Sequence, residues 1–437
     1  MARFLGCGLV AVAACARADF QGATHLMPFD EETLAYSKSP DTSSVARLQK
    51  RIDAGEVTLK KDARFGYLLS VLEALGVPRA SQMLVFSKTS FQRDRIAPST
   101  PRALYYNDGV YIGYVAGSPL LEVSAVDAKL GAVFYTMEQK EAAKPRFVRT
   151  DNCTECHASA KTMGVPGHLV RSFQTDESGM VDLLTGVDFV NHRTALADRW
   201  GGWYVTGTHG AQLHRGNLIG KDAFDRQLTQ PNHSGNVTDL GRFIDTGRYP
   251  EPGSDIVALM VMEHQTHMHN FITRLAYEAK IQLSAYGHAN YLKSATEAFV
   301  KYLLFAEEAP LVAPVRGRAD FAANFSKAGP RDRRGRSLRD FDLNTRLFKY
   351  PCSYLVYSDS FDALPDPVKE KLYRRIYEIL TGRDETDAYA RLTPSMRREI
   401  LEILADTKPG LPSYWREAVR TAAAGASPSS RVAATSR

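Results

Sequence analysis

Cysteine is scarce in this chain of 437 residues, and its scarcity excludes a framework of disulfides. Of the five cysteines, two lie in the first fifteen residues and two form a closely spaced pair in the middle of the chain. Only Cys352 remains outside these groups, so packing must stabilise the fold without cross-links. We expect Cys352 to be a buried, inert thiol, with an intermolecular link or a metal as the alternatives.

Long apolar runs are also missing once the N-terminus has been passed. No later stretch reaches the roughly 18 consecutive apolar residues that predict a membrane-spanning helix. The net charge of +6 is not gathered into a nucleic-acid-binding motif, so we expect no nucleic acid partner. No internal repeat is present. With 44% hydrophobic and 24% charged residues, the composition is typical of a globular protein, long enough for two or three compact units.

The N-terminus has the pattern of an export signal. Met1–Arg3 is a short positive start, Phe4–Ala14 is apolar but too short to cross a bilayer, and Ala16–Ala18 is a small-x-small cleavage site before Asp19. The sequence therefore predicts a signal over residues 1–18 and a mature protein in the periplasm or cell envelope.

The four residues that end at Cys15 also resemble a lipobox, which offers a second way of processing. Cys15 would then be acylated and become the mature N-terminus, and the protein would be tethered to a membrane as a lipoprotein. The apolar core before Cys15 is short, so simple cleavage is favoured. A membrane is a partner only if Cys15 is lipidated.

The motif Cys153-Thr154-Glu155-Cys156-His157 carries the clearest chemistry in the chain. Two thiols three positions apart and followed by an imidazole are typical of covalent haem attachment. Each thiol adds to one vinyl group of the porphyrin as a thioether, and the imidazole becomes the proximal ligand of the iron. The sequence predicts one covalently attached haem c per chain, held by Cys153, Cys156 and His157.

Three other interpretations of this pair are weaker. A thioredoxin-like redox pair follows a strand, and no apolar strand directly precedes Cys153. A structural zinc site needs four ligands, and only Cys352 is left to supply a further thiolate. The third alternative is an ordinary buried pair. The export signal supports haem, because bacteria attach haem covalently outside the cytoplasmic membrane.

The spacing of apolar residues predicts strands first and helices later. Val45–Leu75 is expected to be helical, and Asn107–Gly109 to be a hairpin turn. Strands are expected over Met83–Phe86, Arg102–Tyr106, Val110–Val115, Leu120–Val126 and Ala132–Met137, with extended segments at Met180–Val190 and Trp200–Thr206. After a loop over 230–252, helices are expected over Asp255–Ile281 with Ser254 as N-cap, Tyr291–Glu308, Asp366–Thr381 and Pro394–Ala405.

These segments predict an α+β fold rather than a compact all-α cytochrome c alone. The expected organisation is a β-rich N-terminal unit over 19–140, a loop-rich haem-attachment unit over 141–252 and a mainly helical unit over 253–421. The tail over 422–437, rich in Ala, Ser and Gly, is expected to be disordered.

The haem motif resembles that of c-type cytochromes. The whole chain is similar to large, uncharacterised single-haem proteins of bacterial envelopes that are described only as cytochrome c domain-containing. The runs Trp200–Gly210 and Tyr350–Leu355 are similar to segments of those proteins, without a known function. A small cytochrome c domain is all-helical and has a methionine ligand some tens of residues downstream. This chain departs from that pattern, because the residues after His157 look extended and irregular.

The second axial ligand would separate an electron carrier from an enzyme. His264 and His209 are the best candidates, followed by Met268. On a helix, His264 lies at the centre of an apolar stripe, whereas His269 points to the other side. The stripe comprises Val257, Met260, Val261, His264, His267, Met268, Phe271 and Leu275.

His209 lies with His214 in a glycine-rich loop after Trp200 and Trp203, whose rings could pack on a porphyrin. For any one of these histidines, the alternative is a satisfied core or loop histidine. Met163 is tethered too closely to the motif to reach the opposite haem face.

Two further groups have weaker interpretations. His264, His267 and His269 could bind another metal, but no carboxylate pattern completes such a site. The charge run over 331–339 could supply an arginine to a haem propionate, whereas such runs are usually solvated loops.

Two functions from different classes follow. The first is a mono-haem electron-transfer cytochrome that exchanges electrons with redox partners outside the cytoplasm. The second is a haem enzyme, peroxidase-like, with an open or displaceable distal site. One haem needs far fewer than 437 residues, so a third function, an envelope-binding module, stays open.

Overall fold

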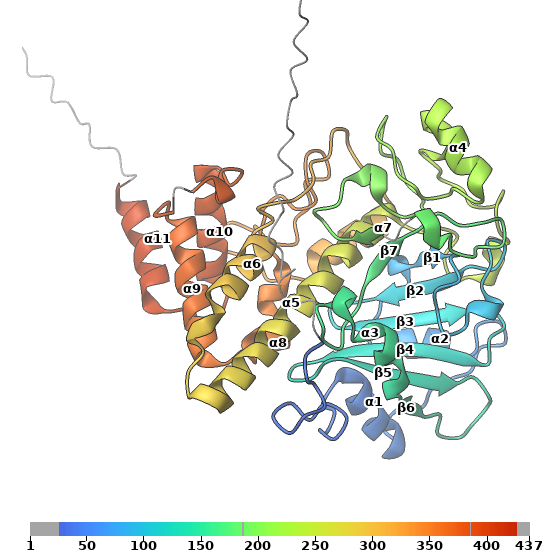
Figure 1. The fold of residues 1–437 in the computed structure, drawn as a ribbon, viewed down its shortest axis with the longest axis horizontal. Coiled ribbons are helices and arrows are strands. Elements are labelled where there is room, and N and C mark those ends of the chain that lie inside the picture. Colours follow the sequence, from blue (N-terminus) through green and yellow to red (C-terminus); the bar gives the residue numbers. More distant parts are fainter. Residues whose placement is uncertain (1–25, 186–187, 385, 426–437) are drawn as a thin grey trace, which may run out of the picture.

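The molecule consists of an antiparallel sheet and a group of helices packed beside it (Figure 1). The computed structural model describes residues 26–185, 188–384 and 386–425. The sheet is built mainly from the N-terminal half and the helices from the C-terminal half, so the predicted α+β class is confirmed. The predicted export signal and the end of the predicted tail, 426–437, lie outside the described residues.

Seven strands form the main sheet, in the order β6-β5-β4-β3-β2-β1-β9. The turn between β2 and β3 is the predicted hairpin, since the Asn107 side-chain oxygen accepts hydrogen bonds from the backbone of Gly109 and Val110 at 3.1 and 2.9 Å. The first five strands confirm the predicted segments to within a residue or two. The strands are β1 Met83–Val85, β2 Arg102–Tyr106, β3 Val110–Val115, β4 Leu120–Asp127, β5 Gly131–Glu138, β6 Phe147–Arg149 and β9 Trp203–Tyr204.

One face of this sheet is covered by α1 (Ser44–Asp53) and α2 (Leu68–Ala74), which bury alternate residues of each strand in an apolar core. The prediction of one helix over Val45–Leu75 is wrong. The chain leaves the helix at Ala54 and passes through Gly55 at a φ of 76°, a conformation that glycine adopts without strain. The connection over 55–67 is irregular.

The long helix α5 (Ile256–Tyr286) lies against the other side and carries the molecule's largest core (Figure 1). Its N-cap is Asp255, whose carboxylate accepts a hydrogen bond from Ala258 N at 2.8 Å, so the prediction of Ser254 as the cap is wrong. Ser254 instead accepts from Leu84 N at 2.9 Å and donates to Tyr204 O at 2.6 Å, which joins it to the sheet. Residues are buried around most of α5, so the predicted apolar stripe does not single out one functional face.

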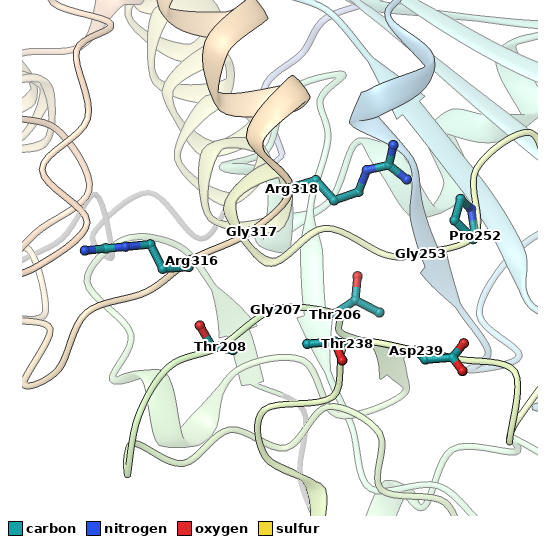
Figure 2. A pocket seen from close by; sticks show the side chains of 10 residues that line it. All are labelled: Thr206, Gly207, Thr208, Thr238, Asp239, Pro252, Gly253, Arg316, Gly317 and Arg318. Carbon is teal, nitrogen blue, oxygen red and sulfur yellow. The ribbon is translucent and has the colours of Figure 1, made fainter.

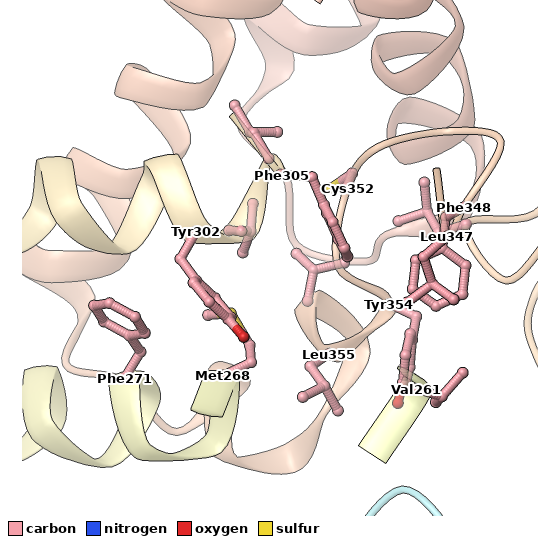
Figure 3. Packing of buried hydrophobic residues seen from close by; sticks show 14 of the residues in the cluster. Val261, Met268, Phe271, Tyr302, Phe305, Leu347, Phe348, Cys352, Tyr354 and Leu355 are labelled. Carbon is pink, nitrogen blue, oxygen red and sulfur yellow. The ribbon is translucent and has the colours of Figure 1, made fainter. Parts of the chain in front are cut away.

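The remaining helices pack beside α5. Figure 3 shows the ring of Tyr302 from the following helix lying over Met268 and Phe271 of α5. Predicted helices correspond to α6, α9 and α10, whereas α4, α7, α8 and α11 were not predicted. The helices are α4 Lys221–Thr229, α6 Lys293–Leu303, α7 Ala319–Lys327, α8 Asp359–Asp362, α9 Asp366–Leu380, α10 Pro394–Thr407 and α11 Ser413–Gly425. The helix α11 therefore continues into the first residues of the predicted disordered tail.

The segment 141–252 contributes strands to the main sheet and also forms a small sheet of two strands. It supplies β6 and β9 to the two edges of the main sheet, and it holds a small two-stranded sheet of β7 (Val170–Ser172) and β8 (Asp188–Val190). In the described part of the extended segment predicted over Met180–Val190, the strand is β8, and residues 183–185 form a 3-10 turn. No helix of the described residues is both long and apolar enough to cross a membrane.

Candidate haem-attachment site

The CxxCH motif forms a short helical turn directly after the edge strand β6. The turn comprises a 3-10 segment, Asp151–Cys153, and the four-residue helix α3, Thr154–His157. It lies in front of the sheet face opposite α1 and α2 (Figure 1). Cys156 is exposed and Cys153 is half-buried, and a spacing of three in a helical turn puts both thiols on one side. The thiols are therefore accessible to a large planar group.

His157 is held by the loop that follows it. Its Nδ1 lies 3.0 Å from the backbone oxygen of Gly167, and the Gly167 N–H donates back to the His157 oxygen at 2.8 Å. Because a carbonyl can only accept, Nδ1 carries the proton and Nε2 is left with its lone pair. Within the described residues Nε2 has no hydrogen-bond partner. A metal-ligating histidine is usually oriented by such a bond to a carbonyl.

Burial keeps the His157 ring neutral, because it lowers the pKa of the imidazole to about 4. A neutral imidazole with a free Nε2 is the form that binds haem iron. Together with the exposed cysteine side chains, these features fit a covalently attached haem: Cys153 and Cys156 would hold it and His157 would ligate its iron.

The wall behind His157 is aromatic. Phe134 on β5 lies 4.9 Å from the His157 ring, centroid to centroid, and the His168 ring lies at 6.5 Å. The Nε2 atom of His168 is hydrogen-bonded to Ser124 Oγ at 2.5 Å, and its ring packs against Tyr111 at 4.2 Å. Burial lowers the pKa of His168 well below its ordinary value. His168 is thus a packed neighbour of the proximal histidine.

An ion pair on the sheet lies close to the cysteines. Arg102 on β2 binds Glu122 on β4, and the Arg102 side chain crosses the intervening strand at Gly113, where a Cβ atom would collide with it. The carboxylate also accepts from Ser90 Oγ at 2.9 Å. Burial, with a smaller effect from the Glu122 charge, raises the pKa of the Cys153 thiol to about 11. This thiol is therefore protonated at neutral pH.

The structure does not bring His264 to the motif. Its Nε2 is hydrogen-bonded to Ser353 Oγ at 2.7 Å and its Nδ1 to His192 Nδ1 at 2.8 Å, so both ring nitrogens are in use. The ring stacks on Tyr302 within the helical core. It makes no contact with residues 153–157 within the described part of the chain.

His209 also lies apart from the motif. It accepts from Asn236 N at 2.9 Å through Nε2, and its ring lies 4.6 Å from that of His214. The assignment of His264 or His209 as the distal ligand stays a prediction that the arrangement does not support.

Histidine and arginine do gather inside the molecule, away from the cysteines. Arg199 binds Glu263 at 2.9 Å and donates to the His192 oxygen at 3.3 Å, next to His264. These four residues are at most 3% exposed, so they form a buried network. Among the described residues no group of three or more His, Cys, Asp or Glu side chains could hold a metal ion, so a second metal at His264, His267 and His269 finds no support.

The arginines of the run over 331–339 already have protein carboxylates as partners. The pairs are Arg331–Asp340, Arg333–Asp406, Arg334–Glu402, Arg336–Asp332, Arg336–Glu402 and Arg339–Asp108. Their role as propionate partners, which the sequence suggested, stays a prediction that these ion pairs do not support. Cys352 is fully buried, as predicted, and burial raises the pKa of its thiol.

A cavity of about 510 Å³ opens beside the N-terminus of α5 and is lined by the segments 206–208, 238–239, 252–253 and 316–318 (Figure 2). Of the two arginines in it, Arg318 is paired with Glu251 at 2.9 Å, and Arg316 donates to the Val315 and Leu343 carbonyls. None of the motif residues lines it. The cavity is therefore separate from the haem-attachment site.

Comparisons with protein-family models, with curated proteins and with solved structures found no match for this chain. The site therefore has to be interpreted from its own geometry. Sequence reasoning missed Gly167, Phe134, Arg102 and Glu122 as its surroundings. Gly167 could have been suspected as a neighbour of His157, because it follows ten residues later. The other three lie on strands β2, β4 and β5, which are distant in sequence.

Proposed function

We propose that this protein is a mono-haem c-type cytochrome that transfers electrons outside the cytoplasm. The observation that carries the proposal is His157, a neutral imidazole whose Nδ1 is fixed by the Gly167 carbonyl beside two accessible cysteine side chains. Haem supplies a one-electron Fe(III)/Fe(II) couple when it is bound. The partner would be a redox protein or a small oxidant or reductant.

The residues of the chain prepare the site in three ways. The Gly167 carbonyl orients the His157 ring and fixes its tautomer. Phe134 supplies an apolar wall behind that ring. The exposure of Cys156 leaves the attachment edge facing the surface, where a redox partner can approach.

Covalent attachment is tested by substitution of the cysteines. We expect the purified, denatured protein to keep haem-linked peroxidase staining on a gel, and Cys153→Ala together with Cys156→Ala to abolish it. The matched control is Cys352→Ala, which removes the buried thiol of the helical core and should leave the staining intact. Staining that survives the double substitution would refute covalent haem.

A second candidate function is a haem enzyme, peroxidase-like, with an open or displaceable distal site. The observation that favours it is that the two distal candidates have protein partners: both ring nitrogens of His264 are hydrogen-bonded, and His209 accepts from Asn236 N through Nε2. Optical and EPR spectra separate the two. A low-spin ferric signal indifferent to cyanide and CO favours the carrier, whereas a high-spin iron that binds them favours the enzyme.

A further inference from the structure

Arg171 on β7 is placed beside the haem-attachment motif by the loop that carries Gly167. The Gly167 N–H donates to the His157 oxygen at 2.8 Å, and Arg171 follows four residues later. Its cross-strand neighbour Phe189 lies 5.5 Å from the ammonium of Lys161, which follows the motif by four residues. The Arg171 backbone is fixed on two sides: Trp203 Nε1 donates to the Arg171 oxygen at 2.8 Å, and the residue pairs with Phe189 on β8. The position of this side chain is therefore set by a small sheet.

Among the described side chains, the guanidinium of Arg171 has no ion-pair or hydrogen-bond partner. It is half-buried and lies over the Phe173 ring at 5.2 Å. Other arginines near the site or in the interior have carboxylates: Arg102 has Glu122 and Arg199 has Glu263. Withdrawing a guanidinium from water without an anion is costly. A bound anion would offset that cost.

Burial lowers the pKa of the Arg171 guanidinium, because the charge is partly withdrawn from water. No carboxylate among the described side chains pairs with it. A group attached at the neighbouring CxxCH motif would bring an anion to this arginine.

The structure assigns Arg171 as the anchor of a haem propionate, an inference that rests on the proposed haem function. The two propionates are the only charged substituents of the porphyrin, and a planar guanidinium binds a carboxylate through two parallel hydrogen bonds. Phe189, directly across the β7–β8 ladder and 40% exposed, presents an apolar ring on the same face. The porphyrin would thus be covered by the β7–β8 hairpin as well as by the main sheet.

The test compares Arg171→Gln with Lys161→Gln. Lys161 is an exposed cation four residues after His157, and its ammonium lies 5.5 Å from the Phe189 ring centroid, so it controls for loss of charge without loss of a propionate contact. The measurements are covalent haem content, the midpoint potential and the propionate bending mode in the resonance Raman spectrum. Arg171→Lys provides a conservative rescue.

We expect all three variants to keep covalent haem, because the thioethers hold it. Removal of a contacting cation favours the ferric form, so Arg171→Gln should shift the redox equilibrium about tenfold, which lowers the potential by about 59 mV for one electron. It should also move the propionate mode, whereas Arg171→Lys should restore most of both changes and Lys161→Gln should cause less than half of the potential shift.

An Arg171→Gln protein with the wild-type potential and propionate mode would overturn the assignment. So would Lys161→Gln effects as large as those of Arg171→Gln, since the propionate partner would then be the lysine. A wild-type protein without covalent haem would overturn the proposed function and this inference with it, and the haem content distinguishes that outcome from failure of Arg171 alone.

Discussion

At the scale of single residues, His269 illustrates how burial fixes protonation in this protein. The ring lies on α5, and its Nε2 donates to the Asp108 oxygen at 2.8 Å. Burial lowers the pKa of His269 to about 4, as it does for His157, and lowers that of His214 to about 3. Each of these rings is neutral in the folded chain at pH 6, whereas an unfolded histidine binds a proton below about pH 6.5.

We therefore predict that the free energy of unfolding decreases as the pH falls from about 6.5 towards 4. The folded-state pKa is depressed, so the unfolded state binds more protons in this window and is favoured by acid. Each buried histidine contributes a slope of about 1.4 kcal/mol per pH unit. His269→Gln keeps a donor for Asp108 but cannot titrate, so urea unfolding at pH 7.5, 6 and 5 should show a slope smaller by that amount. An unchanged slope would contradict a buried, neutral His269.

At the scale of elements, α5 depends on the residue at its N-cap. Asp255 is 1% exposed, accepts from Ala258 N at 2.8 Å and accepts from Arg318 N at 2.5 Å. One carboxylate thus caps the 31-residue helix and holds the loop that leads into α7. Ser254, which looks like the cap in the sequence, is used to join the helix to the sheet.

Asp255→Ala is expected to lower the free energy of unfolding by about 2 kcal/mol, because it removes the cap and leaves two buried N–H groups without an acceptor. Asp255→Asn keeps one oxygen for Ala258 N and should cost about half as much. Chemical denaturation followed by circular dichroism measures both. The matched control is Ser254→Ala, which removes hydrogen bonds to Leu84 and Tyr204 but not the cap. A cost for Asp255→Ala below that of Asp255→Asn would contradict the assigned role.

At the scale of the whole molecule, the CxxCH motif and the predicted export signal both favour a location outside the cytoplasm. The signal lies outside the described residues, and the motif lies at the surface of the folded part. Since haem is attached after export in bacteria, a correctly matured protein should be both processed and loaded.

We predict that the protein purified from the envelope fraction begins at Asp19, or carries lipid on Cys15. Intact-mass measurement distinguishes the two forms, and each should include the mass of one haem. Ala18→Tyr places a bulky residue in the cleavage site and should leave a precursor, whereas Cys15→Ala should prevent only the lipidated form. Unprocessed protein that carries haem in the cytoplasm would contradict the proposed localisation.

The sequence by itself determined most of the strands, and it gives the candidate attachment residues. Cys153, Cys156 and His157 are recognised from spacing along the chain, because the thioether and iron bonds require neighbours in sequence. Strands β2 and β3 were predicted with the correct ends, since alternating apolar residues and the Asn107–Gly109 turn are local signals.

Only the tertiary structure decided what surrounds those residues. Phe134, the Arg102–Glu122 pair and Arg171 come from strands that meet through register and loop closure, which leave no periodic signal in the sequence. The same limit explains His264: its place in an apolar stripe is local and was predicted, but its partners, Ser353 and His192, come from 89 and 72 residues away. Long-range packing, not helix periodicity, therefore determines which histidine can face a cofactor.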